Sequence, residues 1–96
     1  FNFSDAHLDD ARSALRRLQS GGAHDQTIAW YERGIEIEPL AEHFYQSLMR
    51  IYQVLRRPAE GLGVYQRCRT ILAAELKVVP SRETEALARA LRGIGA

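Results

Sequence analysis

The sequence predicts an all-α domain built as a short array of antiparallel helical hairpins, with about five helices. Apolar residues recur three and four positions apart in successive stretches, turn residues separate these stretches, and no stretch alternates as a strand would. Residue types also recur after 34 positions, a period typical of a two-helix repeat. The pairs with this separation are Thr27 and Gly61, Tyr31 and Tyr65, Arg33 and Arg67, and Gly34 and Cys68.

The first helix is expected at about 4–19, because its apolar residues form one stripe and its acidic residues lie near the N-terminus, where the helix dipole stabilises them. Gly21-Gly22 ends this helix. Asp25 is a suitable N-cap for a second helix that runs to about Glu38. Trp30 and Ile37 are expected beside the inner face of the second helix.

The third helix is expected at about 41–55, after the break at Pro39. It is apolar on two flanks, as expected of a helix packed between neighbours. These flanks consist of Tyr45, Leu48, Tyr52 and Leu55 on one side and Phe44 and Ile51 on the other.

The fourth helix is expected at about 58–76, with Pro58 in the first position, where its missing N–H costs nothing. Its apolar stripe includes Gly61, which is therefore expected to lie against the preceding helix. Gly63 should cost about 1 kcal/mol relative to Ala unless a neighbour packs close to it.

An extended connector is expected at 77–80, because Pro80 disfavours the α conformation at the residue before it. Ser81 then caps a fifth helix that runs to about residue 92, and Gly93 and Gly95 stop it. The 34-residue period divides the chain into a first repeat at about 8–41, a second at about 42–75 and a closing helix at about 81–92. One core is expected to contain Tyr31, Tyr45, Leu48, Tyr52, Tyr65 and Leu72.

Composition and charge exclude several classes of protein. The 96 residues suffice for one small domain, and no apolar run approaches the roughly 18 residues of a membrane span. The single cysteine, Cys68, cannot form an intrachain disulfide, so a cytoplasmic location is expected. The first residues, 1–4, resemble neither a translation start nor a signal peptide, which indicates a piece of a longer polypeptide.

The net charge of +1 gives no general attraction to nucleic acid or to an anionic membrane. The charges are nevertheless unevenly placed. Residues 1–48 contain eight acidic and four basic side chains, whereas residues 49–96 contain four and nine. Together with Trp30 and Ile37 beside the inner face, these opposite charges are compatible with a homodimer. The alternative is that Trp30 and Ile37 pack on the first helix.

Several motifs of the sequence together resemble a known family. They are Tyr31-Glu32-Arg33-Gly34, Glu38-Pro39-Leu40, Ser47-Leu48-Met49-Arg50-Ile51-Tyr52, Tyr65-Gln66-Arg67-Cys68-Arg69 and Pro80-Ser81-Arg82-Glu83-Thr84. Between about residues 27 and 91, the chain resembles a tetratricopeptide repeat and, more closely, the bacterial transcriptional activator domain. The latter is a helical module of some bacterial transcription regulators.

Some residues depart from these patterns. Leu15 and Met49 stand where a tetratricopeptide repeat normally has Gly or Ala, which counts against a generic peptide-binding adaptor but agrees with the activator domain. Lys77 stands where the activator domain usually has Gly, and Arg82 where Pro is common. A connector of different shape is therefore expected there.

No residues suggest catalysis, a metal site or a cofactor. His7, His24 and His43 lack the spacing of metal ligands, and Cys68 falls on an inner stripe, where a free cysteine acts as a small hydrophobe. The acidic residues in first turns are explained by the helix dipole. We therefore expect a protein that is not an enzyme.

Three functions without catalysis remain open. The resemblance implies a protein-interaction module of a transcription regulator, which contacts another domain, a second protomer or the transcription machinery and leaves DNA to a domain elsewhere. The second is a freestanding adaptor that binds a peptide of a partner. The third is direct nucleic-acid binding through five arginines, namely Arg50, Arg56, Arg57, Arg67 and Arg69.

The tetratricopeptide likeness also implies where a partner would bind, since the first helix of each hairpin lines a concave groove in that fold. The groove positions fall on Arg12, Arg16 and Gln19 in the first repeat and on His43, Gln46, Arg50 and Gln53 in the second, with Asp9 beside the first set. Arginines at these positions can bind a carboxylate through two parallel hydrogen bonds. A solvated face with an i,i+4 arginine pair is the alternative.

Overall fold

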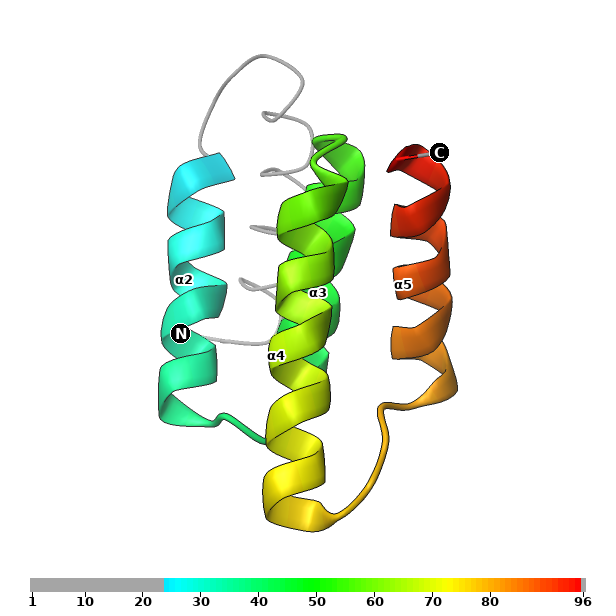
Figure 1. Ribbon diagram of the computed structural model, residues 1–96. Helices are drawn as coiled ribbons and strands as arrows, with labels where there is room; N and C mark the ends of the chain where they lie inside the picture. The colour runs from blue at the N-terminus through cyan, green and yellow to red at the C-terminus, as the bar shows by residue number, and fades with distance from the viewer. Residues whose placement is uncertain (1–23, 96) are drawn as a thin grey trace.

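The computed structural model describes residues 24–95, and all regular secondary structure among them is helical. The helices are α2 (His24–Ile37), α3 (Glu42–Val54), α4 (Pro58–Leu76) and α5 (Arg82–Gly95), shown in Figure 1. The helix expected at about 4–19 lies outside the described residues. The prediction of an all-α array of hairpins is confirmed.

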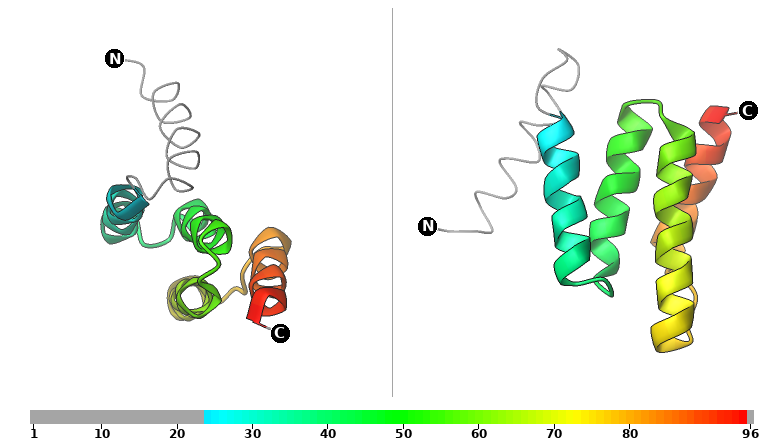
Figure 2. Two further views of the ribbon diagram at one scale, coloured as in Figure 1. Left: turned by 90° about the horizontal axis from the view of Figure 1, so that it is seen from above. Right: turned by 60° about the vertical axis from the view of Figure 1, so that its left-hand side comes forward.

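Helix α3 lies at the centre of the described helices and packs against α2, α4 and α5. Viewed from above, α2 and α5 lie on opposite sides of α3, while α4 lies against both α3 and α5 (Figure 2). This arrangement explains why α3 is apolar on two flanks, since each flank is covered by a different neighbour.

The helix boundaries follow the sequence prediction closely, with two corrections. Asp25 was expected to cap α2 but lies inside it, in the first turn. Gly93 was expected to help end the last helix, but α5 continues through it to Gly95. A glycine lowers helix propensity without blocking the helical conformation. The turn that contains Gly93 is retained because the next residue, Ile94, is partly buried against the core.

All six residues predicted for the core are buried in one cluster. Met49 and Leu91 are fully buried in the same cluster, as is Cys68. Met49 replaces the small residue of a tetratricopeptide repeat, and its flexible unbranched side chain fills the interior at that position.

Two glycines of α4 have different surroundings. A Cβ atom on Gly61 would lie 2.8 Å from both Cδ atoms of Leu91 and 3.2 Å from the Cβ atom of Tyr52. The predicted contact of Gly61 with the preceding helix is therefore confirmed, and α5 approaches the same point. A Cβ atom on Gly63 would meet nothing within 4 Å.

Arg56 and Lys77, at the ends of α3 and α4, adopt the left-handed backbone conformation. Arg56 has φ 56°, and the amide groups of Arg56 and Arg57 donate to the carbonyls of Gln53 and Tyr52 at the end of α3. Lys77 ends α4 with φ 57° and ψ 35°, and its amide donates to the carbonyl of Leu72. The prediction of an extended connector is therefore wrong at Lys77, because a left-handed residue is needed to turn the chain out of α4.

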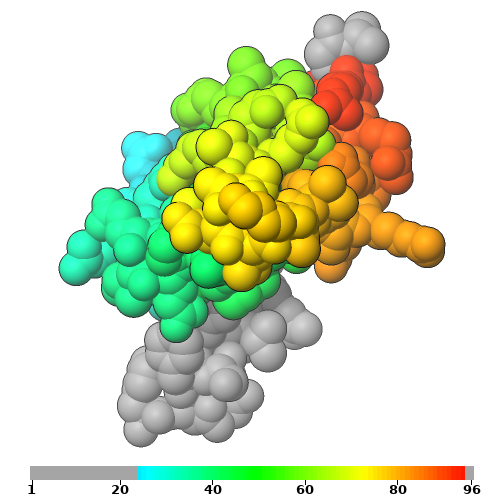
Figure 3. Space-filling view, turned by 60° about the horizontal axis from the view of Figure 1, so that its bottom comes forward, coloured from blue at the N-terminus to red at the C-terminus, as the bar shows by residue number. Residues whose placement is uncertain are grey.

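One end of the domain exposes several apolar side chains. This end is formed by the turn between α2 and α3, the last turn of α4 and the connector that follows (Figure 3). The exposed side chains there are Ile37, Leu40, Leu76, Val78 and Val79.

Candidate functional site

The predicted groove residues fall in two groups. Arg12, Arg16 and Gln19 lie outside the described residues. The other four, His43, Gln46, Arg50 and Gln53, lie on α3 at spacings that place them along one side of the helix. Helix α5 packs beside this side of α3, so the structure adds a second wall to the predicted surface.

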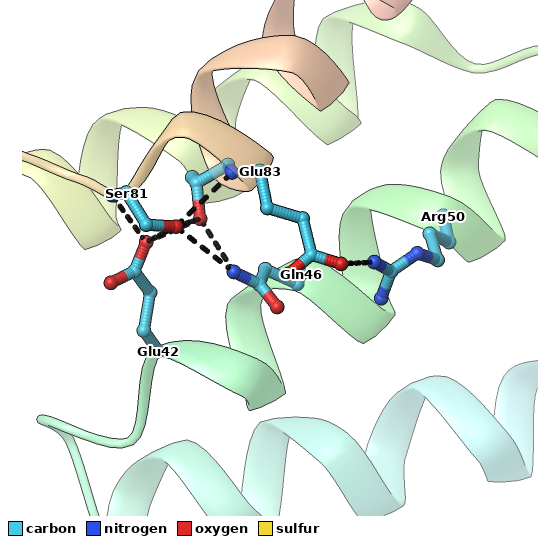
Figure 4. A network of polar contacts seen from close by, with 6 residues as sticks. Glu42, Gln46, Arg50, Ser81 and Glu83 are labelled. Atoms are coloured by element: carbon cyan, nitrogen blue, oxygen red, sulfur yellow. Dashed lines mark hydrogen bonds and ion pairs between the residues drawn. The ribbon is translucent and has the colours of Figure 1, made fainter.

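Gln46 is buried by its contact with α5. Its side-chain amide donates to the hydroxyl of Thr84 at 2.9 Å and to the hydroxyl of Ser81 at 3.3 Å (Figure 4). Thr84 is fully buried, so each of these two polar side chains supplies a hydrogen-bond partner that the other needs. Gln46 therefore positions α5 and presents little surface to a partner.

Glu42 caps the start of α5 from the neighbouring helix. Its carboxylate accepts hydrogen bonds from the Ser81 amide at 2.8 Å, from the Ser81 hydroxyl at 2.9 Å and from the Thr84 hydroxyl. These bonds satisfy the unpaired N–H at this end of α5 and place a negative charge where the helix dipole favours one. The Ser81 hydroxyl also accepts from the Thr84 amide at 3.4 Å, which confirms Ser81 as a cap.

The hydrogen bonds to Glu42 determine the direction of its pKa shift. Burial by itself would raise the pKa of Glu42, but the hydrogen bonds from Thr84 and Ser81 together lower that pKa below its ordinary value. The carboxylate is thus ionised at neutral pH, as its capping role requires.

Arg50 forms an ion pair with Glu83 of α5 (Figure 4). The two side chains are 46% and 61% exposed, so the pair contributes about 0–1 kcal/mol to stability. His43 is exposed and Gln53 is half-buried on the same helix. Arg50, Glu83 and His43 thus form the accessible part of the surface along α3.

The sequence did not indicate the contacts between Glu42 and α5. Ser81 was expected to cap the last helix, but nothing in the sequence linked it to a glutamate 39 residues earlier in the chain. The acidic residue at the start of α3 was the available signal, but dipole stabilisation explains such a residue equally well.

Arginines proposed for the nucleic-acid alternative are largely occupied by carboxylates. Arg50 pairs with Glu83, Arg57 with Glu60 at 2.6 Å, and Arg67 with Glu32 at 2.7 Å. Within residues 24–95, Arg56 and Arg69 have no carboxylate oxygen within the 4.0 Å of an ion pair. Three of the five positive charges are therefore already compensated within the domain.

Cys68 lies in the core, where its surroundings lower its reactivity. Burial raises the pKa of the Cys68 thiol to about 12, and the negative charges of Glu42 and Glu85 act in the same direction. The thiol therefore stays protonated at neutral pH, and a protonated thiol is a weak nucleophile. Among the described residues, no three His, Cys, Asp or Glu side chains are grouped so that they could hold a metal ion.

An open depression of about 450 Å³ lies along α4. Its lining consists of Tyr45, Gln66, Arg67, Thr70, Ile71 and Ala74. The charged group in it, Arg67, is paired with Glu32, and the phenol of Tyr45 donates to the carbonyl of Pro39 at 2.8 Å. The depression thus offers an apolar surface without free charged groups.

Comparison with known proteins gave one match. The model of one family, described as the bacterial transcriptional activator domain, matches residues 4–92. Neither the curated proteins nor the solved structures gave a match. Within the described part of the chain, every helix is too short or too polar to cross a membrane.

Proposed function

The chain belongs to the bacterial transcriptional activator domain family, and on this premise we propose that it is a non-catalytic module that binds protein within a bacterial transcription regulator. Its partners are another domain of the regulator, a second protomer or the transcription machinery. DNA is contacted by a domain outside these residues, and the protein works in the cytoplasm.

The observation that carries this proposal is the surface shared by α3 and α5. Helices α3 and α5 are held together by a buried hydrogen bond that Gln46 donates to Thr84 and by a part-buried one that Glu42 accepts from Thr84, so their relative position is well determined. On α3, Arg50 and His43 reach solvent. A rigid surface with a few exposed polar groups binds a protein segment without a large ordering cost.

The first test combines Arg16→Glu with Arg50→Glu and measures binding of purified bacterial RNA polymerase and of a second, labelled copy of the domain. The proposal expects one of these partners to bind the unchanged domain and to lose affinity for the double variant. The change at Arg50 should alter the melting temperature little, since exposed side chains contribute little to stability. Binding that is retained in the double variant would place the interface on another face.

A charge swap separates the loss of a partner contact from the loss of the internal ion pair. The variant with Arg50→Glu and Glu83→Arg keeps an opposite pair between α3 and α5 but reverses the charge presented on α3. If Arg50 binds the partner, the swapped protein has normal stability and weak binding. If Arg50 serves only the helix contact, the swap restores both properties.

Nucleic-acid binding is tested by titrating salt against binding to a DNA duplex. Contacts with phosphates give a steep decrease of affinity with salt concentration. The proposal expects weak binding, because ion pairs within the domain already engage most of the arginines considered for this role.

A further inference from the structure

Several exposed arginines lie on α4 and α5, two helices that pack against each other. They are Arg69 on α4 and Arg82, Arg89 and Arg92 on α5. No ion pair joins any of the four to a carboxylate of residues 24–95, whereas Arg33, Arg50, Arg57 and Arg67 all have one. The uncompensated positive charge of the described residues is therefore concentrated on this pair of helices, together with Arg56 and Lys77.

Tyr65 organises the middle of this surface. Its ring is buried, and its hydroxyl donates to the carboxylate of Glu85, with both oxygens at 2.6 Å. The hydrogen bond to Glu85 is the largest contribution that raises the pKa of Tyr65, and burial acts in the same direction. The guanidinium of Arg92 lies over the same ring at 5.6 Å from its centre, a favourable cation–π geometry.

The helical spacing determines where the other arginines lie relative to Tyr65 and Arg92. Arg69 comes one turn after Tyr65 on α4, and its positive charge acts on the Tyr65 phenol. Arg89 lies one turn before Arg92 on α5, so the two occupy neighbouring positions on one side of that helix. Arg92 and Arg69 thus lie near Tyr65, whereas Arg89 and Arg82 extend the positive charge along α5, and we call these four residues the arginine seam.

The charge of the arginine seam is only partly compensated. Glu85 is the acidic residue held at its centre, and its carboxylate already accepts the Tyr65 hydroxyl. Four arginines and one glutamate give the seam a net charge of +3. An arginine held against an aromatic ring loses less freedom when it binds a carboxylate, so this arrangement favours an acidic ligand.

Apolar side chains continue the surface at the end where α4 leads into α5. Leu76, Val78 and Val79 are 50%, 47% and 80% exposed there, next to the start of α5 that carries Arg82 (Figure 3). A DNA duplex presents phosphates to such a surface but few apolar groups. A protein segment with acidic and aliphatic side chains complements both parts.

We propose that the arginine seam and the aliphatic end beside it bind an acidic, amphipathic helical segment of a partner protein. The inference rests on the proposed role in protein interaction, but it concerns α4 and the outer side of α5, away from α3. Glutamate or aspartate side chains of the segment pair with Arg69, Arg89 and Arg92, and its aliphatic side chains contact Leu76 and Val79.

The test uses a fluorescent synthetic helix of roughly 18 residues, or five turns, with glutamates on one face and leucines on the adjoining face. The whole chain is titrated into this peptide, and anisotropy is recorded. The patch variant carries Arg69→Glu with Arg89→Glu, two exposed residues that make no ion pair with residues 24–95. We expect it to bind at least about tenfold more weakly, which corresponds to about 1.4 kcal/mol.

A matched control changes the net charge by the same amount elsewhere. It carries Arg33→Glu with Arg56→Glu, two exposed arginines on α2 and at the end of α3. If the seam is the binding site, the control keeps affinity close to that of the unchanged protein. Circular dichroism of both variants establishes that each is folded, so a loss of binding is not a loss of structure.

Three results would overturn the inference. The first is that the peptide does not bind the unchanged protein. The second is that the patch and control variants lose affinity for the peptide equally. The third is that a short DNA duplex binds the seam more tightly than the peptide does. The last result would assign the seam to nucleic acid instead. Because RNA polymerase binding through Arg16 and Arg50 is measured separately, failure here leaves the proposed function standing.

Discussion

Replacing Gly61 with leucine tests how closely the three helices approach one another at this position. Gly61 is buried, and its Cβ position faces both methyl groups of Leu91 and the Cβ atom of Tyr52. Leu91 is fully buried, so its methyl groups have no open space into which to move. A leucine side chain at position 61 therefore has to push α4 away from α3 and α5.

The magnitude follows from two opposing contributions. Removing a glycine from the interior of a helix gains about 0.8–1.0 kcal/mol of helix propensity. Contacts at 2.8 Å to Leu91 and 3.2 Å to Tyr52 already require these neighbours to shift for the Cβ atom alone, before the rest of the leucine side chain is placed. Overpacking of a core costs about 1–3 kcal/mol, and because side chains of two helices face this position we expect a cost of about 3 kcal/mol. Subtracting the propensity gain leaves a net destabilisation of about 2 kcal/mol.

Gly63 provides the matched control on the same helix. A Cβ atom at this position meets nothing within 4 Å, so Gly63→Leu keeps the propensity gain without the clash. Urea unfolding followed by circular dichroism gives both free energies. Gly63→Leu should be more stable than the unchanged protein by up to about 1 kcal/mol. A Gly61→Leu variant as stable as the unchanged protein would refute the close approach of the helices.

Three further variants or measurements test other features. Arg56→Gly should raise the free energy of unfolding by about 1 kcal/mol, because Arg56 holds a left-handed conformation that glycine adopts without cost; a lower midpoint in urea would contradict this. Glu42 has a lowered pKa, so its contribution is complete above the unfolded pKa of about 4.3 and is lost as the pH falls through the folded pKa. Glu42→Gln should therefore be less stable at neutral pH and should lose less stability on acidification, and equal acid sensitivity would count against the cap. Cys68 should react with a thiol reagent at pH 8 only as fast as the protein opens, because its pKa is about 12 and it is fully buried; immediate labelling of the native protein would disagree.

The helices were predictable because their signals are local. Apolar spacing, Pro58 at the first position of α4 and the break at Pro39 depend only on residues close in the chain. The core tyrosines also followed from this spacing, since each stripe must be buried against another helix. Gly93 was misread because a local signal for ending a helix was outweighed by the packing of Ile94.

The polar surface was less predictable because it depends on where α5 packs. The groove residues on α3 were selected as exposed positions, yet α5 buries Gln46 and pairs with Arg50. Periodicity shows which face of α5 is apolar but not which side chains of α3 it meets. Ion pairs such as Arg67 with Glu32 likewise join residues 35 positions apart and leave no trace in the local pattern. The binding role of the predicted groove residues stays a prediction.

The contacts of α5 also explain why one helix can serve two surfaces. Glu83 and Glu85 are two residues apart, so they point to different sides of α5, the first to Arg50 on α3 and the second to Tyr65 on α4. Between them, Thr84 is fully buried and hydrogen-bonded to Gln46, which prevents α5 from rotating about its axis. A partner on the α3 side and an acidic segment on the arginine seam would therefore meet the same rigid helix from opposite sides. If neither partner moves α5, binding at one site should leave the affinity of the other unchanged.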